Sequence, residues 1–174
     1  MSIWIKVFCQ DSIASVTPED LITGIAKRLV LLTYLFSPDE EEDPDEVLER
    51  LRIENQSKSE GFHVFQIFYA KKSNQFIRVE RWAGITAVEE AHESLDMLAD
   101  ERGEAVERVR DMLKHSTESV GFELKVRDAN SMGWPVSIAA AAWLAERSQG
   151  VIYAEGSGWM VPSPREVEFL LREE

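Results

Sequence analysis

The chain has 174 residues, an apolar share of 44% and a formal net charge of −13, which suits one folded domain, or one domain with an appendage. The negative charge opposes nucleic-acid binding, no apolar run could span a bilayer, and the N-terminus lacks the features of a secretory signal. The only cysteine, Cys9, excludes an internal disulfide and a multi-cysteine metal site, so we expect a cytoplasmic protein without a cofactor, a metal, or contact with nucleic acid or membrane.

The first third of the chain predicts a strand, a long helix and a short helix, with an acidic loop between the helices. Thr17 can accept a hydrogen bond from a free amide of the first helical turn, and Pro18 suits the first position of the long helix. The loop carries two prolines and a run of like charges, and Asp45 is expected to cap the short helix. The expected elements are a strand over 3–9, a helix over 17–34, a helix over 45–51 and a short extended segment over 52–55.

The central part predicts a β-hairpin, a helical segment and a further strand. Two aromatic and β-branched runs, 62–70 and 76–82, flank a short polar link, which is typical of a hairpin. Thr86, with a glutamate three residues later, forms a capping-box pattern for a long acidic helix that Gly103 divides. Residues 119–127 then alternate apolar and polar side chains, as in a half-buried strand.

Over residues 1–128 the elements follow the order strand, helix, strand, strand, helix, strand, which is the order of ferredoxin-like folds. With right-handed crossovers, the first strand would lie beside both the third and the fourth, and the two main helices would share one face of the sheet. We therefore predict an α+β protein with a ferredoxin-like core. The side chains expected on the core face are Ile3, Ile5, Val7, Ile77, Val79, Val120, Phe122, Leu124 and Val126.

Residues 129–174 are expected to add a C-terminal extension packed on the sheet, within the same globular unit, in the order helix, strand, strand, helix. Pro135 starts a helix rich in small residues, which suits close packing on a sheet. A Gly-Ser-Gly turn then indicates a second hairpin. The expected hairpin strands are 151–155 and 159–161, and the closing helix begins at Arg165 or Glu166.

The opposite face of the sheet would collect aromatic and charged side chains. Three interpretations of this face remain open: the tail covers it, it is the self-association surface of a homo-oligomer, or it binds an anionic or aromatic ligand. The residues expected on this face are Trp4, Lys6, Phe8, Phe76, Arg78, Glu80, Trp82, Glu123, Lys125 and Arg127.

A small-molecule binder or an enzyme would use a cluster of tryptophan and arginine side chains. Trp134 comes directly before Pro135 at a helix start, where free backbone amides attract anions. The alternative is that Trp134 only anchors the connection onto the sheet. The candidate ligand-binding residues are Trp82, Arg78, Arg81, Trp134 and Trp159.

Two acidic segments account for the net charge. Residues 37–60 hold ten acids and three bases, and residues 86–118 hold ten acids and four bases. Phosphate-loop, dinucleotide-binding and zincin motifs are missing from the sequence. We therefore expect a non-enzymatic interaction module, in one specific form an immunity-like or inhibitor-like protein that binds a basic partner. The candidate partner-binding residues are Asp39, Glu40, Glu41 and Glu42.

Overall fold

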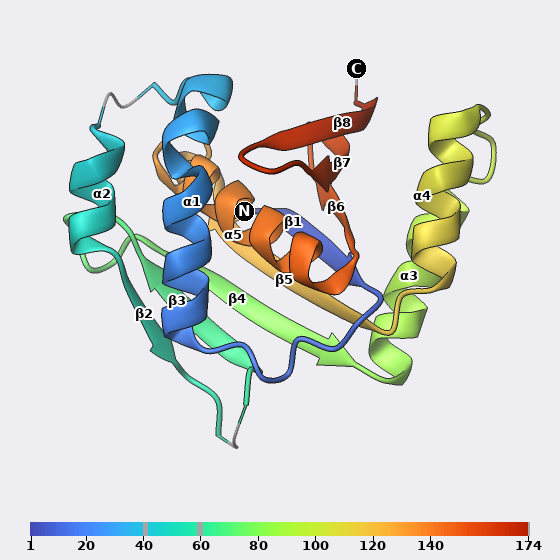
Figure 1. Cartoon of the computed structure of the whole chain (residues 1–174), viewed down its shortest axis with the longest axis horizontal. Coiled ribbons are helices and arrows are strands. Elements are labelled where there is room, and N and C mark those ends of the chain that lie inside the picture. Colours follow the sequence, from blue (N-terminus) through green and yellow to red (C-terminus); the bar gives the residue numbers. More distant parts are fainter. Residues whose placement is uncertain (40–41, 59–60, 174) are drawn as a thin grey trace.

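The computed structural model describes residues 1–39, 42–58 and 61–173, and within them the chain forms an eight-stranded sheet and five α-helices (Figure 1). The architecture mixes α and β elements, as expected. The strands are β1 (Ser2–Cys9), β2 (Arg52–Asn55), β3 (Val64–Phe68), β4 (Phe76–Ala83), β5 (Glu118–Lys125), β6 (Val151–Ala154), β7 (Gly158–Pro162) and β8 (Val167–Arg172). The helices are α1 (Pro18–Phe36), α2 (Pro44–Arg50), α3 (Ile85–Met97), α4 (Glu104–Lys114) and α5 (Gly133–Ser148), with a 3₁₀ turn over Val126–Asp128.

The strand order differs from the ferredoxin-like order. The sheet runs β2-β3-β4-β5-β1-β6-β7-β8, and every neighbouring pair is antiparallel. The predicted hairpin is confirmed as β3 with β4, and β1 lies beside β5 as expected. However, β4 pairs with β5 and not with β1, so the expected second neighbour of the first strand is wrong.

The connection between β4 and β5 explains this order. Ala83 at the end of β4 is paired with Glu118 at the start of β5, so the chain leaves and re-enters the sheet at the same end. The two strands therefore form a β-hairpin with α3 and α4 inserted in its turn. A crossover connection would instead have returned the chain parallel to β4.

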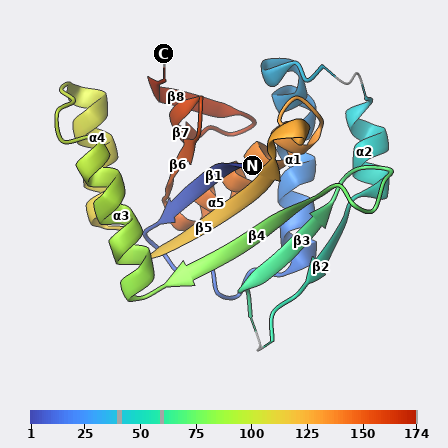
Figure 2. The same cartoon turned by 180° about the vertical axis from the view of Figure 1, so that it is seen from behind.

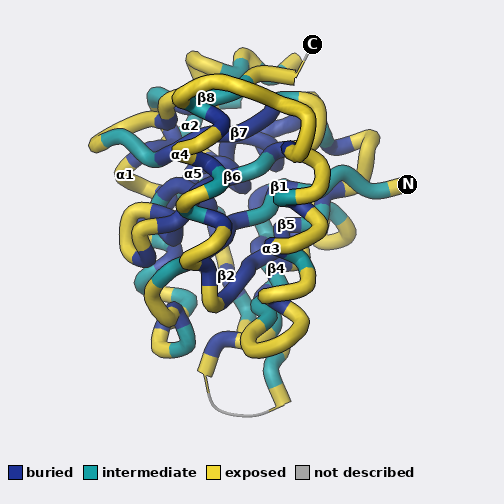
Figure 3. Tube along the Cα trace, turned by 90° about the vertical axis from the view of Figure 1, so that its right-hand side faces the viewer, coloured by how far each residue is buried: buried dark blue, intermediate teal, exposed yellow. Residues whose placement is uncertain are grey.

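The main hydrophobic core lies between one face of the sheet and the helices α1, α2 and α5. Ile5, Val79 and Phe122 are buried there, as the alternation predicts, and buried residues gather around β1, β5 and α5 (Figure 3). The helix α5 packs on β1 and beside α1, in the place expected for the acidic helix. Gly24 permits the close approach of α1 to α5, because a Cβ there would lie 2.2 Å from the Trp143 ring.

A second, smaller core lies on the opposite face of the sheet. Phe8, Val151 and Trp159 contribute to it from the strands, and Val109 and Leu113 contribute from α4. The expectation that both main helices share one face is therefore wrong. The helices α3 and α4 instead stand together at one side of the sheet, opposite α1 and α2 (Figures 1 and 2), and we call residues 85–114 the helical arm.

The C-terminal segment extends the sheet and does not cover its second face. The strand β6 pairs with β1, and the predicted hairpin is confirmed as β6 with β7. The expected closing helix is wrong, because Val167–Arg172 forms β8 against β7. A short apolar run is compatible with a helix or a strand, and the hydrogen bonds offered by β7 decide the outcome. Figure 2 shows that the tail leaves the face of β2–β5 open, whereas at the end of β1 Phe8 packs against Trp159 of the tail, so the tail covers only part of this face.

Local capping is confirmed for α1 and corrected for α2. The Thr17 side chain accepts a hydrogen bond from the amide of Asp20, and the Asp20 side chain accepts one from the amide of Thr17. The cap of α2 is Asp43 and not Asp45, because Pro44 occupies the first helical position and the residue before it becomes the cap.

Two further element ends differ from the sequence prediction. The helix α3 begins at Ile85, and Thr86 is not its cap, because Gly84 makes the turn out of β4 with a φ of +67°. The strand β5 ends at Lys125, so Val126 lies in the 3₁₀ turn and is 43% exposed rather than in the core.

Candidate functional site

The predicted tryptophan and arginine cluster is distributed over four places in the structure. Arg78 and Trp82 lie on the open face of β4, while Arg81 points to the other side of the same strand and pairs with a buried carboxylate. Trp134 lines a cavity near the end of α1, and Trp159 is buried in the second core. The structure therefore does not bring these five side chains together in one site.

On the open face, two tryptophans pack against the bare backbone of β5. The ring centroids of Trp4 and Trp82 are 6.5 Å apart, and both rings lie against Gly121. A Cβ on Gly121 would come within 2.8 Å of the Trp82 ring, so the glycine makes room for it. Arg78 forms an ion pair with Glu80, with a nitrogen to oxygen distance of 3.0 Å. Packing and local pairing account for Trp82 and Arg78 without a ligand.

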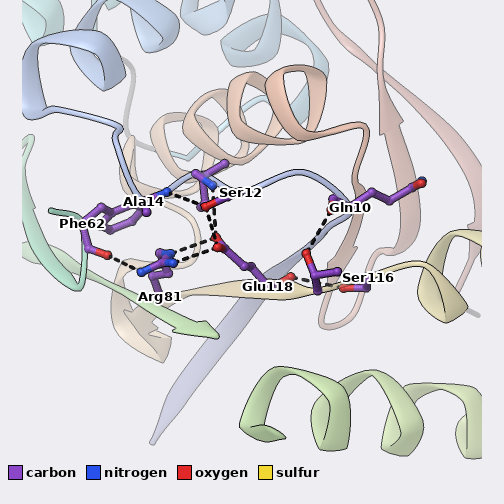
Figure 4. A network of polar contacts seen from close by, with 9 residues as sticks. Gln10, Ser12, Ala14, Phe62, Arg81, Ser116 and Glu118 are labelled. Carbon is purple, nitrogen blue, oxygen red and sulfur yellow. Dashed lines mark hydrogen bonds and ion pairs between the residues drawn. The ribbon is translucent and has the colours of Figure 1, made fainter. Parts of the chain in front are cut away.

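Arg81 belongs to a buried polar network that joins three segments of the chain (Figure 4). Its Nε and Nη2 donate to the two carboxylate oxygens of Glu118 at 2.9 and 2.8 Å. Glu118 also accepts from the Ser12 hydroxyl at 2.6 Å and from the amide of Ile13 at 3.0 Å, and Arg81 donates to the carbonyl of Phe62 at 3.2 Å. The pair therefore holds the loop after β1 and the start of the hairpin against the sheet.

Hydrogen bonding in this network changes the ionisation of Glu118. Burial by itself would raise the pKa of Glu118, but the hydrogen bonds from Arg81, Ser12 and Ile13 outweigh it and lower the pKa to about 2. Nearby, burial raises the pKa of Cys9 to about 12. The Cys9 thiol is therefore protonated near neutral pH. Arg81 and Glu118 form a structural ion pair rather than a catalytic acid or base.

The contribution of Glu118 to stability should disappear in acid. The pKa of Glu118 is about 2 in the folded protein against 4.5 for an ordinary glutamate, so its stabilisation is complete above about pH 4.5 and is lost as the pH falls through about 2. Urea unfolding of the wild-type protein and of Glu118→Gln should therefore give a free-energy difference that shrinks between about pH 5 and pH 2.5. A difference that stays constant over this range would contradict a charged, hydrogen-bonded Glu118.

The cavity beside Trp134 is where aromatic and acidic groups converge. Its volume is about 270 Å³, and it lies between the end of α1, the start of α5, the start of β1 and the turn after β6. Phe36 and Trp134 meet there in an edge-on contact, with ring centroids 6.3 Å apart. The lining residues are Ile3, Phe36, Ser37, Pro38, Asp39, Ala129, Asn130, Trp134, Pro135, Glu155 and Ser157.

The charges of this cavity are negative. Asp39 and Glu155 are exposed carboxylates in its wall, and none of the described lining residues is lysine or arginine. The amide group of the Asn130 side chain donates to one oxygen of Asp39 at 2.9 Å, and the backbone amide of Trp4 donates to one oxygen of Glu155 at 3.1 Å. The cavity is therefore electrostatically suited to a cation.

The start of α5 offers no free amide to an anion at this cavity. The amide of Gly133 donates to the Ser131 hydroxyl, and the amide of Trp134 donates to the Ser131 carbonyl. Pro135 has no amide hydrogen, and the amide of Val136 donates to a carbonyl of the preceding turn. The interpretation that an anion binds beside Trp134 therefore loses its physical basis. The Trp134 ring instead packs against Phe36.

Sequence reasoning named Trp134 and Asp39 but did not place them together, and it missed Phe36 and Glu155. These residues come from separate parts of the chain, at the end of α1, the start of α5 and the turn after β6. The sequence has no motif that links them, because only the fold brings the two ends of the helices to one place.

The predicted partner-binding acids near α2 are partly engaged with their own chain. Asp39 is hydrogen-bonded to Asn130, and Glu42 forms an ion pair with Arg50 at 2.7 Å. Glu40 and Glu41 lie outside the described residues. The acids that follow in this segment are exposed, namely Asp43, Asp45, Glu46 and Glu49.

The helical arm carries the largest group of exposed acids in the described chain. It contains nine acids and four bases, and eight of the nine acids are exposed. Glu90 is the exception, since it pairs with Lys6 at 3.4 Å and accepts a hydrogen bond from Ser119. The exposed acids are Glu89, Glu93, Asp96, Asp100, Glu101, Glu104, Glu107 and Asp111.

Comparison of the chain with protein-family models, curated proteins and solved structures found no significant match. Within the described residues, no helix has both the length and the apolar character needed to cross a membrane. Across the same residues, histidine, cysteine, aspartate and glutamate side chains do not gather in groups of three that could hold a metal ion. The acidic arm and the cavity are therefore the two features of the described chain that bear on function.

Proposed function

We propose that this protein is an acidic interaction module that binds a basic protein through its helical arm. The observation that carries the proposal is the row of exposed carboxylates on α3 and α4, which stand at the side of the sheet (Figure 1). Such a surface speeds encounter with a positively charged partner and disfavours negatively charged ones.

The internal bonding of the arm supports this proposal. Arg110 donates to the carbonyl of Glu101 at 3.0 Å, and it also contacts the carbonyl of Leu98 and pairs with Glu107. Arg102 donates to the carbonyls of Ala99 and Glu101, both at 2.8 Å. Two of the four bases of the arm therefore hold the turn between α3 and α4, and of the exposed acids in the described arm they pair only with Glu107.

Apolar side chains beside these acids would contribute to the same interface. Ile85 is 75% exposed and Met97 is 63% exposed, and Val88 lies between them on α3. Exposed apolar side chains within a polar rim are the arrangement found in protein interfaces. We therefore place the partner surface on the helical arm and give a smaller part to the acids around α2.

The small-molecule alternative built on a tryptophan and arginine cluster is less well supported. Its five residues lie apart, Arg78 and Arg81 are paired with Glu80 and Glu118, and Trp159 is enclosed between Phe8 and Tyr153.

Neutralising the arm should slow association with the basic partner. We expect the double variant Glu93→Gln/Glu104→Gln to lower the association rate by about threefold to tenfold at low salt and to change the dissociation rate much less, because exposed charges steer encounter. The matched control is Glu166→Gln/Glu168→Gln, which changes the same charge at exposed positions near or on β8.

The partner would first be isolated from an extract of the native cells by capture at about 0.05 M salt and release at about 0.5 M salt, since salt screens exposed charges. Association and dissociation rates would then be measured by surface plasmon resonance. If the arm variant and the control slowed association equally, the slower association would come from the change in net charge and not from the arm. Failure to recover any basic, salt-sensitive partner would contradict the proposal itself.

A further inference from the structure

We propose that the cavity between Phe36 and Trp134 binds an organic cation, in the form of an alkylammonium or guanidinium group. This inference goes beyond the proposed function, because the cavity shares no residue with the helical arm. It stands on the size of the cavity, its aromatic walls, its two carboxylates and a cation–aromatic contact in the adjoining cluster.

The aromatic walls offer one half of a cation site. The Phe36 and Trp134 rings meet edge to face with their planes at 77°, so they form a corner rather than a flat stack. The face of an aromatic ring carries partial negative charge and attracts an ammonium or guanidinium group, most strongly when the ring is tryptophan. Ile3, Pro38 and Pro135 complete the apolar part of the lining and would contact the carbon stem of such a ligand.

The carboxylates offer the other half. Each of Asp39 and Glu155 accepts a hydrogen bond from the chain through only one oxygen, and among the described residues the second oxygen has no hydrogen-bond partner. Two negative groups with free acceptor atoms, in a wall whose described residues include no lysine or arginine, favour a ligand with several N–H donors. An anionic ligand would be repelled by both groups.

The protein already places one of its own guanidinium groups on the neighbouring part of this aromatic cluster. Arg172 lies over the Phe169 ring, 3.9 Å from the ring centroid, and Phe169 is 6.4 Å from Phe36. These residues line a second cavity of about 250 Å³ that adjoins the first one at Phe36 and Ser157. The cluster therefore holds a cation over Phe169, next to Phe36, and the cavity offers the same chemistry at Phe36 and Trp134.

The size of the cavity limits the ligand. A volume of about 270 Å³ is below the usual range of pockets for drug-sized molecules and nucleotides, and it suits a single charged group on a short apolar stem. Two sources have this chemistry: a small free amine or guanidine, and a lysine or arginine side chain of a polypeptide.

The experiment is a titration of the full chain, followed through the indole N–H signal of Trp134 in assigned nuclear magnetic resonance spectra. The probes are n-butylammonium and ethylguanidinium, with n-butanol and butyrate as the neutral and anionic counterparts of similar size. We expect both cations to shift the Trp134 signal in a saturable way and to bind about tenfold or more tightly than n-butanol. Equal effects of n-butanol, or binding of butyrate, would overturn the proposal.

The variants test the residues. Asp39→Asn/Glu155→Gln keeps an acceptor oxygen for Asn130 and for the amide of Trp4, so the local fold should persist. We expect this variant to bind the cations about fivefold more weakly or worse, because two charge-assisted contacts are lost. Unchanged affinity would overturn the proposal. Glu166→Gln/Glu168→Gln is the control with the same change of charge, and it should bind as the wild type does.

Phe36→Leu provides an independent test of the aromatic wall. It keeps an apolar side chain but removes the ring, so we expect weaker cation binding with little effect on n-butanol. Equal binding of the cations to this variant would contradict a role for the ring.

Two further probes distinguish the sources. A five-residue peptide with a central arginine that binds at least as tightly as ethylguanidinium would assign the cavity to a polypeptide side chain. Binding of agmatine but not of the peptide would assign it to a free cation. Either result supports the cation site, whereas binding of neither would overturn it.

Failure here would also be separable from failure of the proposed function. The arm variant Glu93→Gln/Glu104→Gln should leave cation binding at Trp134 unchanged. The cavity variant in turn leaves every carboxylate of the arm in place.

Discussion

Replacing Glu118 with glutamine is expected to lower the free energy of unfolding by about 3–5 kcal/mol, as found when one partner of a buried ion pair is removed. The side chains of Arg81 and Glu118 are only 9% and 8% exposed, so the remaining arginine would keep its charge in a buried place. The Ser12 hydroxyl and the amide of Ile13 would also lose a charged acceptor. Denaturant unfolding at neutral pH measures this loss.

The control for this prediction is Glu54→Gln on β2. Glu54 forms an ion pair with Arg52 at 3.4 Å, but the two side chains are 42% and 60% exposed. Exposed pairs contribute little, so this substitution should cost less than about 1 kcal/mol. Similar small losses in both variants would mean that water reaches Arg81 and Glu118 and that the network does not hold the loop after β1.

The second large effect is expected from Leu124→Ala, which should cost about 2–5 kcal/mol through lost apolar transfer and a cavity in the core. Leu124 is 1% exposed and lies in the main core, opposite Ile3 of β1. Its burial is as predicted from the alternation of β5, although the helices of this core are α1 and α5 rather than α1 and the acidic helix.

Val126→Ala is an informative control, because strict alternation and the structure disagree on this residue. The alternation assigns Val126 to the core face, whereas the structure leaves it 43% exposed after the end of β5. We therefore expect a loss of less than about 0.5 kcal/mol, as for surface substitutions. A loss as large as that of Leu124→Ala in thermal or denaturant melts would show that β5 continues through Val126.

Several local features could be predicted from the sequence because their causes are local. Thr17 caps α1 through a contact within the first turn, so the residues around the helix start suffice to predict the cap. The hairpin of β3 with β4 follows from two β-rich runs and a short link. The core face of β1, β4 and β5 follows from strict alternation, since a one-residue shift would expose every apolar side chain.

Other assignments failed where two local patterns were equally good. The sequence of Val167–Arg172 is compatible with either a helix or a strand. Pairing with β7 makes this segment the strand β8. Thr86 has the pattern of a helix cap, yet Gly84 reaches a positive φ and starts the helix earlier. In both cases the deciding contact or dihedral angle lies outside the pattern that was used.

The sequence by itself determined the α+β class, most of the strands, the two faces of the sheet and the acidic character of residues 85–114. Only the tertiary structure decided that α3 and α4 leave and re-enter the sheet at one end, that α5 takes their place on the main core, and that Phe36, Asp39, Trp134 and Glu155 line one cavity. The physical reason is the separation along the chain over which each interaction acts. Capping and alternation act over a few residues, whereas strand order and the composition of a cavity depend on contacts between segments far apart in the chain.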